Sequence, residues 1–171
     1  MKAPLGWESL TPSRLRNFEE KVDFVGNSFS AQGFPINGLV AQLHSTESER
    51  MLEAIHCLFE GCRYSAVAMA VSAIEFRLFE FMKQINPEAS KLEKDPLGLL
   101  IKECLNNPDY SKQLPERHQP PLQLCNQFRV FSVHPKTEMI GQNEAMSAIY
   151  LAFSFILDSR VRKASATAFG A

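Results

Sequence analysis

The chain has 171 residues and a formal net charge of -1 at pH 7, with 45% hydrophobic and 22% charged residues. This length suits one domain with a single core, and the composition excludes wholesale disorder. The near-zero net charge excludes an overall basic field that would attract nucleic acid or an acidic membrane surface. The first residues contain no apolar signal region, and charged or polar side chains interrupt the longest apolar runs, so we expect a cytoplasmic protein that does not span a membrane.

The first part of the chain, residues 1–44, has the least regular pattern. Residues 12–29 are compatible with a helix, and the glycines and proline of "AQGFPINGL", residues 31–39, predict a loop. We expect residues 1–44 to form an N-terminal extension that packs on the main body, residues 45–163 to form the main domain, and residues 164–171 to form a tail.

Two long helices are predicted next. In "STESERMLEAIHCLFEG", residues 45–61, Ser45 is the expected N-cap, apolar residues recur at helical spacing, and Gly61 is the expected stop. Residues 63–87 then predict a helix of about six turns. Its first half is rich in small residues that permit close helix contact, so we expect it to be the central helix of a bundle.

The second half of the chain predicts shorter helices. One covers residues 95–107, with Asp95 as its cap and Pro96 at its first position. A proline-rich connector at 108–121 precedes a helix from 122 to about 131, and residues 143–163 again show helical spacing. No segment alternates with period two over a strand's length, so the predicted fold is an all-α antiparallel helical bundle.

The sequence lacks the signatures of most metal and cofactor sites. It contains no glycine-rich phosphate loop, no G-x-S-x-G and no H-E-x-x-H. We expect no cofactor and no metal, because the cysteines are not paired at zinc-ligand spacing. They are best explained as reduced thiols of the core: Cys57, Cys62, Cys104 and Cys125.

Glu75 is notable because it lies in an apolar stretch, where an unpaired buried carboxylate is costly. Two interpretations are open. Glu75 is either an ordinary solvent-facing or salt-bridged glutamate, or a supporting residue that orients an arginine such as Arg129.

The stretch "FRVFSVHP", residues 128–135, places Arg129 and His134 in an otherwise apolar run that ends at a proline. A helix that ends near Phe131 and a turn at "SVHP" could bring both side chains to one opening. The arginine fork matches a phosphate, and a histidine can donate or accept a proton at neutral pH. Together they suffice in principle to cleave RNA through its own 2'-hydroxyl without a metal.

The charges near this pair are mostly positive. The segment from residue 111 to residue 136 contains several lysines and arginines but a single acidic residue, Glu116. We expect Lys136, Arg117 and Ser132 to contact a phosphate-bearing substrate. The alternative is that Arg129 caps a helix end and His134 is an ordinary loop histidine.

The order of these segments resembles the HEPN superfamily (higher eukaryote and prokaryote nucleotide-binding domains). The resemblance covers about residues 45–160 and rests on "AVSAIEFRLFEFM", "LCNQFRVFSVHP" and "NEAMSAIYLAFSFIL". The family signature is an Arg, four to six residues and a His, which Arg129 and His134 match with four. The residue after the arginine is often polar in the family, commonly Asn, whereas this chain has Val130.

The resemblance implies a small helical bundle that forms a homodimer, with the motif lining a cleft between protomers. Arg129 would then bind the scissile phosphate and His134 would act as acid or base in a metal-independent endoribonuclease of the toxin or defence type. The alternative is a non-catalytic module for dimerisation, RNA binding or nucleotide binding. Partners implied in either case are RNA and an antitoxin or nucleotidyltransferase-like protein.

Overall fold

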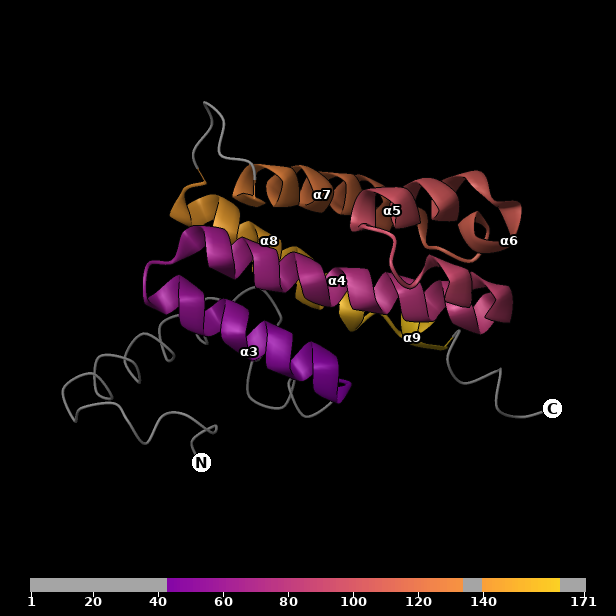
Figure 1. Ribbon diagram of the computed structural model, residues 1–171, viewed down its shortest axis with the longest axis horizontal. Helices are drawn as coiled ribbons and strands as arrows, with labels where there is room; N and C mark the ends of the chain where they lie inside the picture. The colour runs from indigo at the N-terminus through magenta and orange to yellow at the C-terminus, as the bar shows by residue number, and fades with distance from the viewer. Residues whose placement is uncertain (1–42, 134–139, 164–171) are drawn as a thin grey trace. The chain divides into compact units, whose positions relative to one another are not determined.

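The computed structural model describes residues 43–133 and 140–163 (Figure 1). Within these ranges every regular element is helical, which confirms the predicted all-α bundle. The elements in chain order are α3 (Ser45–Phe59), α4 (Arg63–Ile85), the 3-10 helix η3 (Pro87–Leu92), α5 (Leu97–Asn106), α6 (Pro108–Ser111), the 3-10 helix η4 (Glu116–His118), α7 (Gln119–Val133), α8 (Gln142–Ile156) and α9 (Ser159–Lys163).

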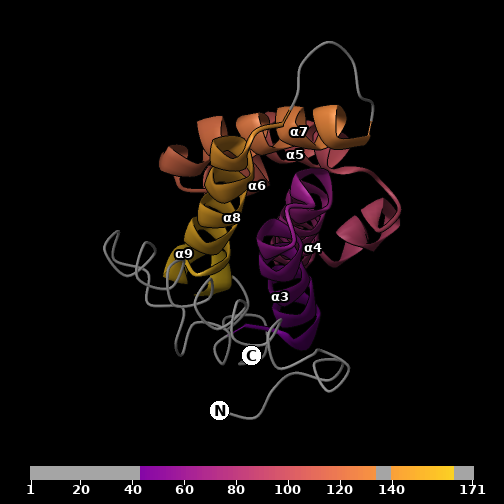
Figure 2. The same cartoon turned by 90° about the vertical axis from the view of Figure 1, so that its left-hand side faces the viewer.

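Helix α4 is the centre of the bundle, as its sequence predicts. It contacts α3, α5, α7 and α8. In Figure 2, α5 and α7 lie at the top of the view, and α3, α4 and α8 lie below them. Small residues let the neighbouring helices approach, and bulky ones fill the remaining space. The buried residues of α4 include Ala66, Ala70, Ala73, Ile74, Leu78, Phe81 and Met82.

The first described helix begins one residue earlier than its predicted cap implies. The N-cap of α3 is His44 and not Ser45: its Nδ1 accepts from the amide of Thr46 at 3.3 Å, and Glu47 accepts from the amide of His44 at 2.9 Å. This is a capping box in which histidine takes the place of serine or threonine. His44, the last residue of the predicted extension, is thus the residue that caps this helix.

Helix α5 begins later than predicted. Its N-cap is Pro96, which has no side chain able to cap, so the predicted cap at Asp95 is wrong. The carboxylate of Glu75 on α4 serves this role instead, because its Oε2 accepts from the amide of Leu97 at 2.9 Å. A residue distant in sequence therefore satisfies a donor that a local cap would otherwise satisfy.

Helix α7 is longer than predicted at both ends. It begins at Gln119 and reaches Val133, whereas the sequence predicted 122 to about 131. Pro120 and Pro121 fit in its first turn because the amides they lack have no partner there within the helix. Two short elements, α6 and η4, interrupt the predicted connector.

The last predicted helix is divided in two. Helix α8 ends at Ile156, and α9 starts after Asp158, whose Oδ1 accepts from the amide of Arg160 at 2.8 Å. Aspartate is a strong N-cap, so it starts a new helix where the apolar spacing alone predicted a continuous one.

No helix in the described ranges is both long and apolar enough to cross a membrane. The predicted tail, residues 164–171, and residues 1–42 of the predicted extension lie outside the described residues.

Candidate functional site

Arg129 lies on α7, just before the last turn of that helix, which contains no basic residue. The side chain is half-buried, and its guanidinium makes no hydrogen bond or ion pair that the structure records with a described residue. The backbone oxygen of Arg129 accepts from the hydroxyl of Ser132 at 2.8 Å. Such a bond from a serine to the carbonyl three residues earlier is common in helices and keeps the serine side chain against the backbone.

The two other predicted residues of this stretch, His134 and Lys136, lie outside the described residues. The prediction that Arg129 and His134 share one opening therefore stays a prediction. The helix itself extends two residues beyond its predicted end at Phe131, as far as Val133.

Arg117, the second arginine predicted to contact substrate, lies on η4, immediately before α7. Arg129 is ten residues past the start of α7, or about 15 Å along the helix at the usual rise. The structure thus does not bring the two arginines together. The guanidinium of Arg117 instead forms an ion pair with Asp158, although its side chain is 63% exposed.

Glu75, predicted as a supporting residue, does not touch Arg129 directly in any recorded contact. Its carboxylate accepts from the amide of Leu97 at the start of α5, and α5 packs against α7. The residue therefore fixes the helix next to the one that carries Arg129.

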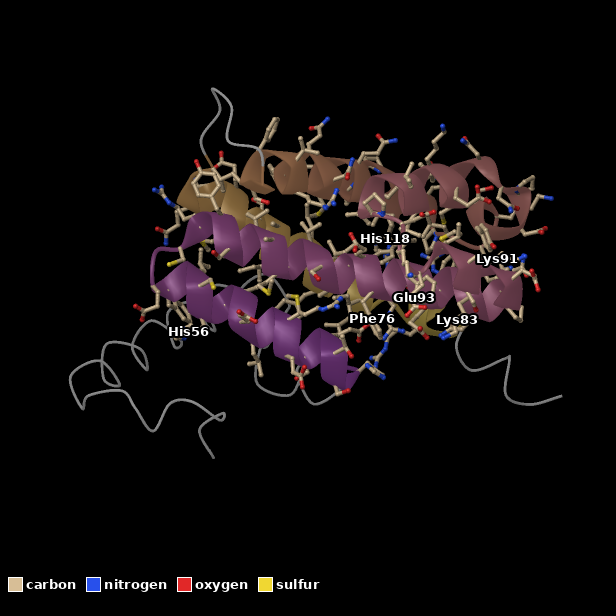
Figure 3. All side chains as sticks on the ribbon, viewed as in Figure 1. His56, Phe76, Lys83, Lys91, Glu93 and His118 are labelled. Carbon is tan, nitrogen blue, oxygen red and sulfur yellow. The ribbon has the colours of Figure 1, made fainter. Side chains whose placement is uncertain are left out.

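Asp158 is the centre of a polar cluster that the sequence did not reveal. Its carboxylate is 2% exposed and interacts with three residues: Arg117, His118 and Arg160. The Nε2 of His118 (labelled in Figure 3) lies 2.7 Å from Oδ2 of Asp158. The His118 ring packs edge-on against Phe155. The cluster joins η4 to the junction of α8 and α9.

The electrostatics of this cluster follow from burial and hydrogen bonding. Burial alone raises the pKa of Asp158, but hydrogen bonds from His118, the amide of Arg160 and Arg117 together lower it to about 2. Burial lowers the pKa of His118, against the opposing effect of Asp158. Because an ionised carboxylate only accepts, Nε2 of His118 carries the hydrogen of this bond.

A histidine oriented by an aspartate resembles part of a catalytic arrangement, but the burial argues for a structural role. The His118 side chain is 3% exposed, so a substrate has no access to the ring. We interpret the cluster as a structural contact that holds η4 against the start of α9.

A second buried ion pair joins α3 to α4. Nε of Arg77 donates to Oε1 of Glu47 at 2.5 Å, and the side chains are 7% and 0% exposed. The other carboxylate oxygen of Glu47 caps the amide of His44. The ring of His44 in turn lies 5.1 Å from that of Phe76.

A hollow of about 400 Å³ lies beside this pair, at the start of α3, and it opens to solvent. None of the residues predicted for the functional site lines it. The lining residues are Leu43, His44, Phe76, Arg77, Glu80, Gln84 and Arg162.

Sequence reasoning missed Glu47, Arg77, His118 and Asp158, which are the buried charged or polar residues of the described core. For Glu47 a signal existed: a glutamate at the third position of a helix is typical of a capping box. Arg77 was visible only as a charge that interrupts an apolar run. Nothing in the sequence pairs His118 with Asp158, which are 40 positions apart.

Over the part of the chain that the structure describes, no group of three or more His, Cys, Asp or Glu side chains could hold a metal ion. A scan of the chain against protein-family models, a search of curated proteins and a search of solved structures find no match.

Proposed function

We propose that the protein is a HEPN-like, metal-independent endoribonuclease of the toxin or defence type that acts as a homodimer. In this proposal Arg129 binds the scissile phosphate and His134 transfers protons. Each protomer contributes one such pair. The observation that carries it is the state of Arg129, a half-buried arginine whose guanidinium has no recorded partner among the described residues. An arginine left without a carboxylate is available for a phosphate.

Chain connectivity supports the pairing of Arg129 with His134. Helix α7 reaches Val133, which lies one helical turn beyond Arg129. A turn of helix and one further peptide unit limit the separation of the Cα atoms of residues 129 and 134 to about 10 Å. Side chains as long as arginine and histidine can meet across this distance over one phosphate.

Other predicted residues enter the proposal in modified roles. Arg117 lies on η4, before the start of α7, and is too far from Arg129 to share a phosphate with it. We therefore assign Arg117 to a phosphate further along the RNA strand, with Asp158 as its orienting partner. Ser132 and Lys136 stay assigned to the substrate beside Arg129. Glu75 supports the site indirectly, because it fixes the start of α5, which packs on α7.

Val130 favours a second candidate function. This residue follows Arg129 at the position that is often polar in the HEPN family, so the motif of this chain lacks one polar group that could assist cleavage. The second candidate is a non-catalytic module for dimerisation, RNA binding or nucleotide binding. An antitoxin or nucleotidyltransferase-like protein is then a possible partner in addition to a second copy of the chain.

The deciding experiment measures cleavage of a panel of RNAs in the presence of a chelator. Under the first proposal the wild-type protein cleaves, and His134→Ala lowers the rate by about 100-fold or more because the acid–base group is lost. Arg129→Ala lowers it similarly. The control is Lys91→Ala, which removes an exposed cation from η3, outside the proposed site, and should cleave normally.

Light scattering and thermal unfolding of the same variants separate the alternatives. The His134→Ala protein should keep the dimer mass and the melting temperature of the wild type. Salt-dependent RNA binding without cleavage, weakened by Arg129→Ala, would support the binding module instead. A wild-type protein that neither cleaves nor binds RNA, and stays monomeric, would exclude both.

A further inference from the structure

The turn between α3 and α4 has a defined hydrogen-bond pattern. Helix α3 ends at Phe59 and its C-cap is Glu60. The next residue, Gly61, adopts a φ of 77°. The amide of Cys62 donates to the carbonyl of Cys57 at 2.8 Å, and the amide of Gly61 donates to that of Leu58 at 3.2 Å. These two bonds, with a glycine in the left-handed region, define a Schellman motif.

This motif brings the backbones of two particular residues together. The residue third from the helix end and the residue just after the left-handed glycine usually make an apolar contact. In this protein these two residues are Cys57 and Cys62. The turn therefore brings together the two cysteines that are not fully buried.

The backbone distances allow a bond between the two sulfurs. The 2.8 Å hydrogen bond joins the backbones of Cys57 and Cys62 directly, and standard bond lengths then limit the separation of their Cα atoms to about 7 Å. Disulfides join residues whose Cα atoms are about 4.4–6.8 Å apart. Because the bond angle at the carbonyl carbon shortens this path, the Cα separation does not exceed the upper end of this range.

We propose that Cys57 and Cys62 form a reversible disulfide that is made by a peroxide and broken by a dithiol. The thiolate of Cys62 attacks hydrogen peroxide, so an S–O bond forms and the O–O bond breaks. The leaving hydroxide takes a proton from solvent, and the products are a sulfenic acid and water. The thiol of Cys57 then displaces the hydroxyl from that sulfur, so the S–S bond forms and a second water leaves. The two cysteines are oxidised and the peroxide is reduced.

The exposure of the two thiols indicates the order of these steps. Cys62 is exposed, whereas Cys57 is half-buried. Burial, the carboxylate of Glu53 and the Cys62 thiol raise the pKa of Cys57, in that order of size. Cys62 is thus the thiol that meets the oxidant, and Cys57 resolves the sulfenic acid.

The two other cysteines provide an internal comparison. Cys104 on α5 and Cys125 on α7 are buried, and burial raises the pKa of each to about 12. Such thiols are inert. Oxidation is therefore directed to the turn, and this holds whether or not the protein cleaves RNA.

The test uses the full-length reduced protein and one equivalent of hydrogen peroxide. After free thiols are blocked with iodoacetamide, the protein is denatured and cut with a glutamate-specific protease. Cleavage after Glu53, Glu60 and Glu75 separates residues 54–60 from residues 61–75. We expect these two peptides to remain joined, without carbamidomethyl groups, and to separate when a dithiol is added.

Control variants connect the bond to the turn. Cys57→Ser and Cys62→Ser should each abolish the linked peptide, and in Cys57→Ser a sulfenic acid on Cys62 should be trapped by dimedone. Cys104→Ser should leave the yield unchanged. The same treatment in urea should form the link at least about tenfold more slowly, because the turn no longer orients the thiols.

Two results would overturn the proposal. One is recovery of the two peptides unlinked, either with Cys62 as a sulfenic or sulfinic acid and Cys57 alkylated, or with both cysteines alkylated after a treatment that oxidises other thiols. The other is a disulfide from Cys62 to a second chain while Cys57 stays alkylated. An equal rate of linkage in urea would overturn the role of the Schellman turn.

Discussion

Arg77 on α4 and Arg129 on α7 both lie in apolar stretches of sequence, but the fold treats them differently. Arg77 is buried and bonded to Glu47, whereas Arg129 is half-exposed and has no recorded polar partner for its guanidinium in the described ranges. A buried arginine without a carboxylate would be strongly destabilising, so the first residue needs its partner for folding. Among the described residues, no carboxylate is recorded as a partner of the second.

The Asp158 cluster lies between these two extremes. Its carboxylate and His118 are buried, but the side chains of Arg117 and Arg160 are each 63% exposed. Solvent screens exposed partners, so each contributes less than a buried one. The comparison predicts that removing one charge from each of these regions lowers the free energy of unfolding by different amounts.

The largest effect on stability is expected for Glu47→Ala. This change leaves the guanidinium of Arg77 buried without its carboxylate and removes the acceptor for the amide of His44, so it should lower the free energy of unfolding by about 3–5 kcal/mol. Denaturant unfolding followed by circular dichroism measures it. The control is Glu88→Ala, which breaks an exposed pair with Lys91 and should change little. Equal effects of both variants would show that the buried pair is not needed.

A smaller, pH-dependent effect is expected for Asp158→Asn. At pH 7 the loss of charge-assisted bonds to His118 and Arg117 should lower stability by roughly 1–3 kcal/mol. Because folding lowers the pKa of Asp158 from 3.8 to about 2, its contribution is present above about pH 4 and is lost as the pH falls toward 2.

Thermal melts of wild type and Asp158→Asn between pH 7 and pH 2 check this sign. The difference between the two proteins should shrink on acidification below about pH 4. A difference that grows there would contradict the assignment of an ionised, hydrogen-bonded carboxylate.

The smallest effect on stability is expected for Arg129→Ala. With no recorded polar partner among the described residues, the guanidinium contributes little to folding, and the variant should unfold within about 0.5 kcal/mol of the wild type. Measured beside Arg77→Ala under the same conditions, it sharpens the contrast between the two arginines. Destabilisation as large as that of Arg77→Ala would mean that Arg129 has a structural partner.

The sequence was informative wherever the signal was local. The stop of α3 at Gly61 and the central position of α4 were predicted from glycine conformation and from the run of small residues. The caps were predicted less well. His44, Glu75 and Asp158 each satisfy backbone amides, and for Glu75 the amide belongs to a residue 22 positions away.

For the candidate site, the sequence singled out Arg129, and the structure adds that its guanidinium has no recorded partner in the described part of the chain. Arg117 was predicted from its charge alone, which could not reveal that Asp158 binds it. The charge of Arg117 is therefore partly neutralised by Asp158 before any substrate binds.

The amino-acid sequence by itself determined the all-α class, most helix positions and the stop of α3 at Gly61, because helical periodicity and glycine conformation act over a few residues. Only the tertiary structure decided which charges are paired. The partners of Arg77, His118 and Glu75 come from elements 22 to 40 positions away, and burial, which sets the cost of leaving a charge unpaired, exists only once those elements have packed.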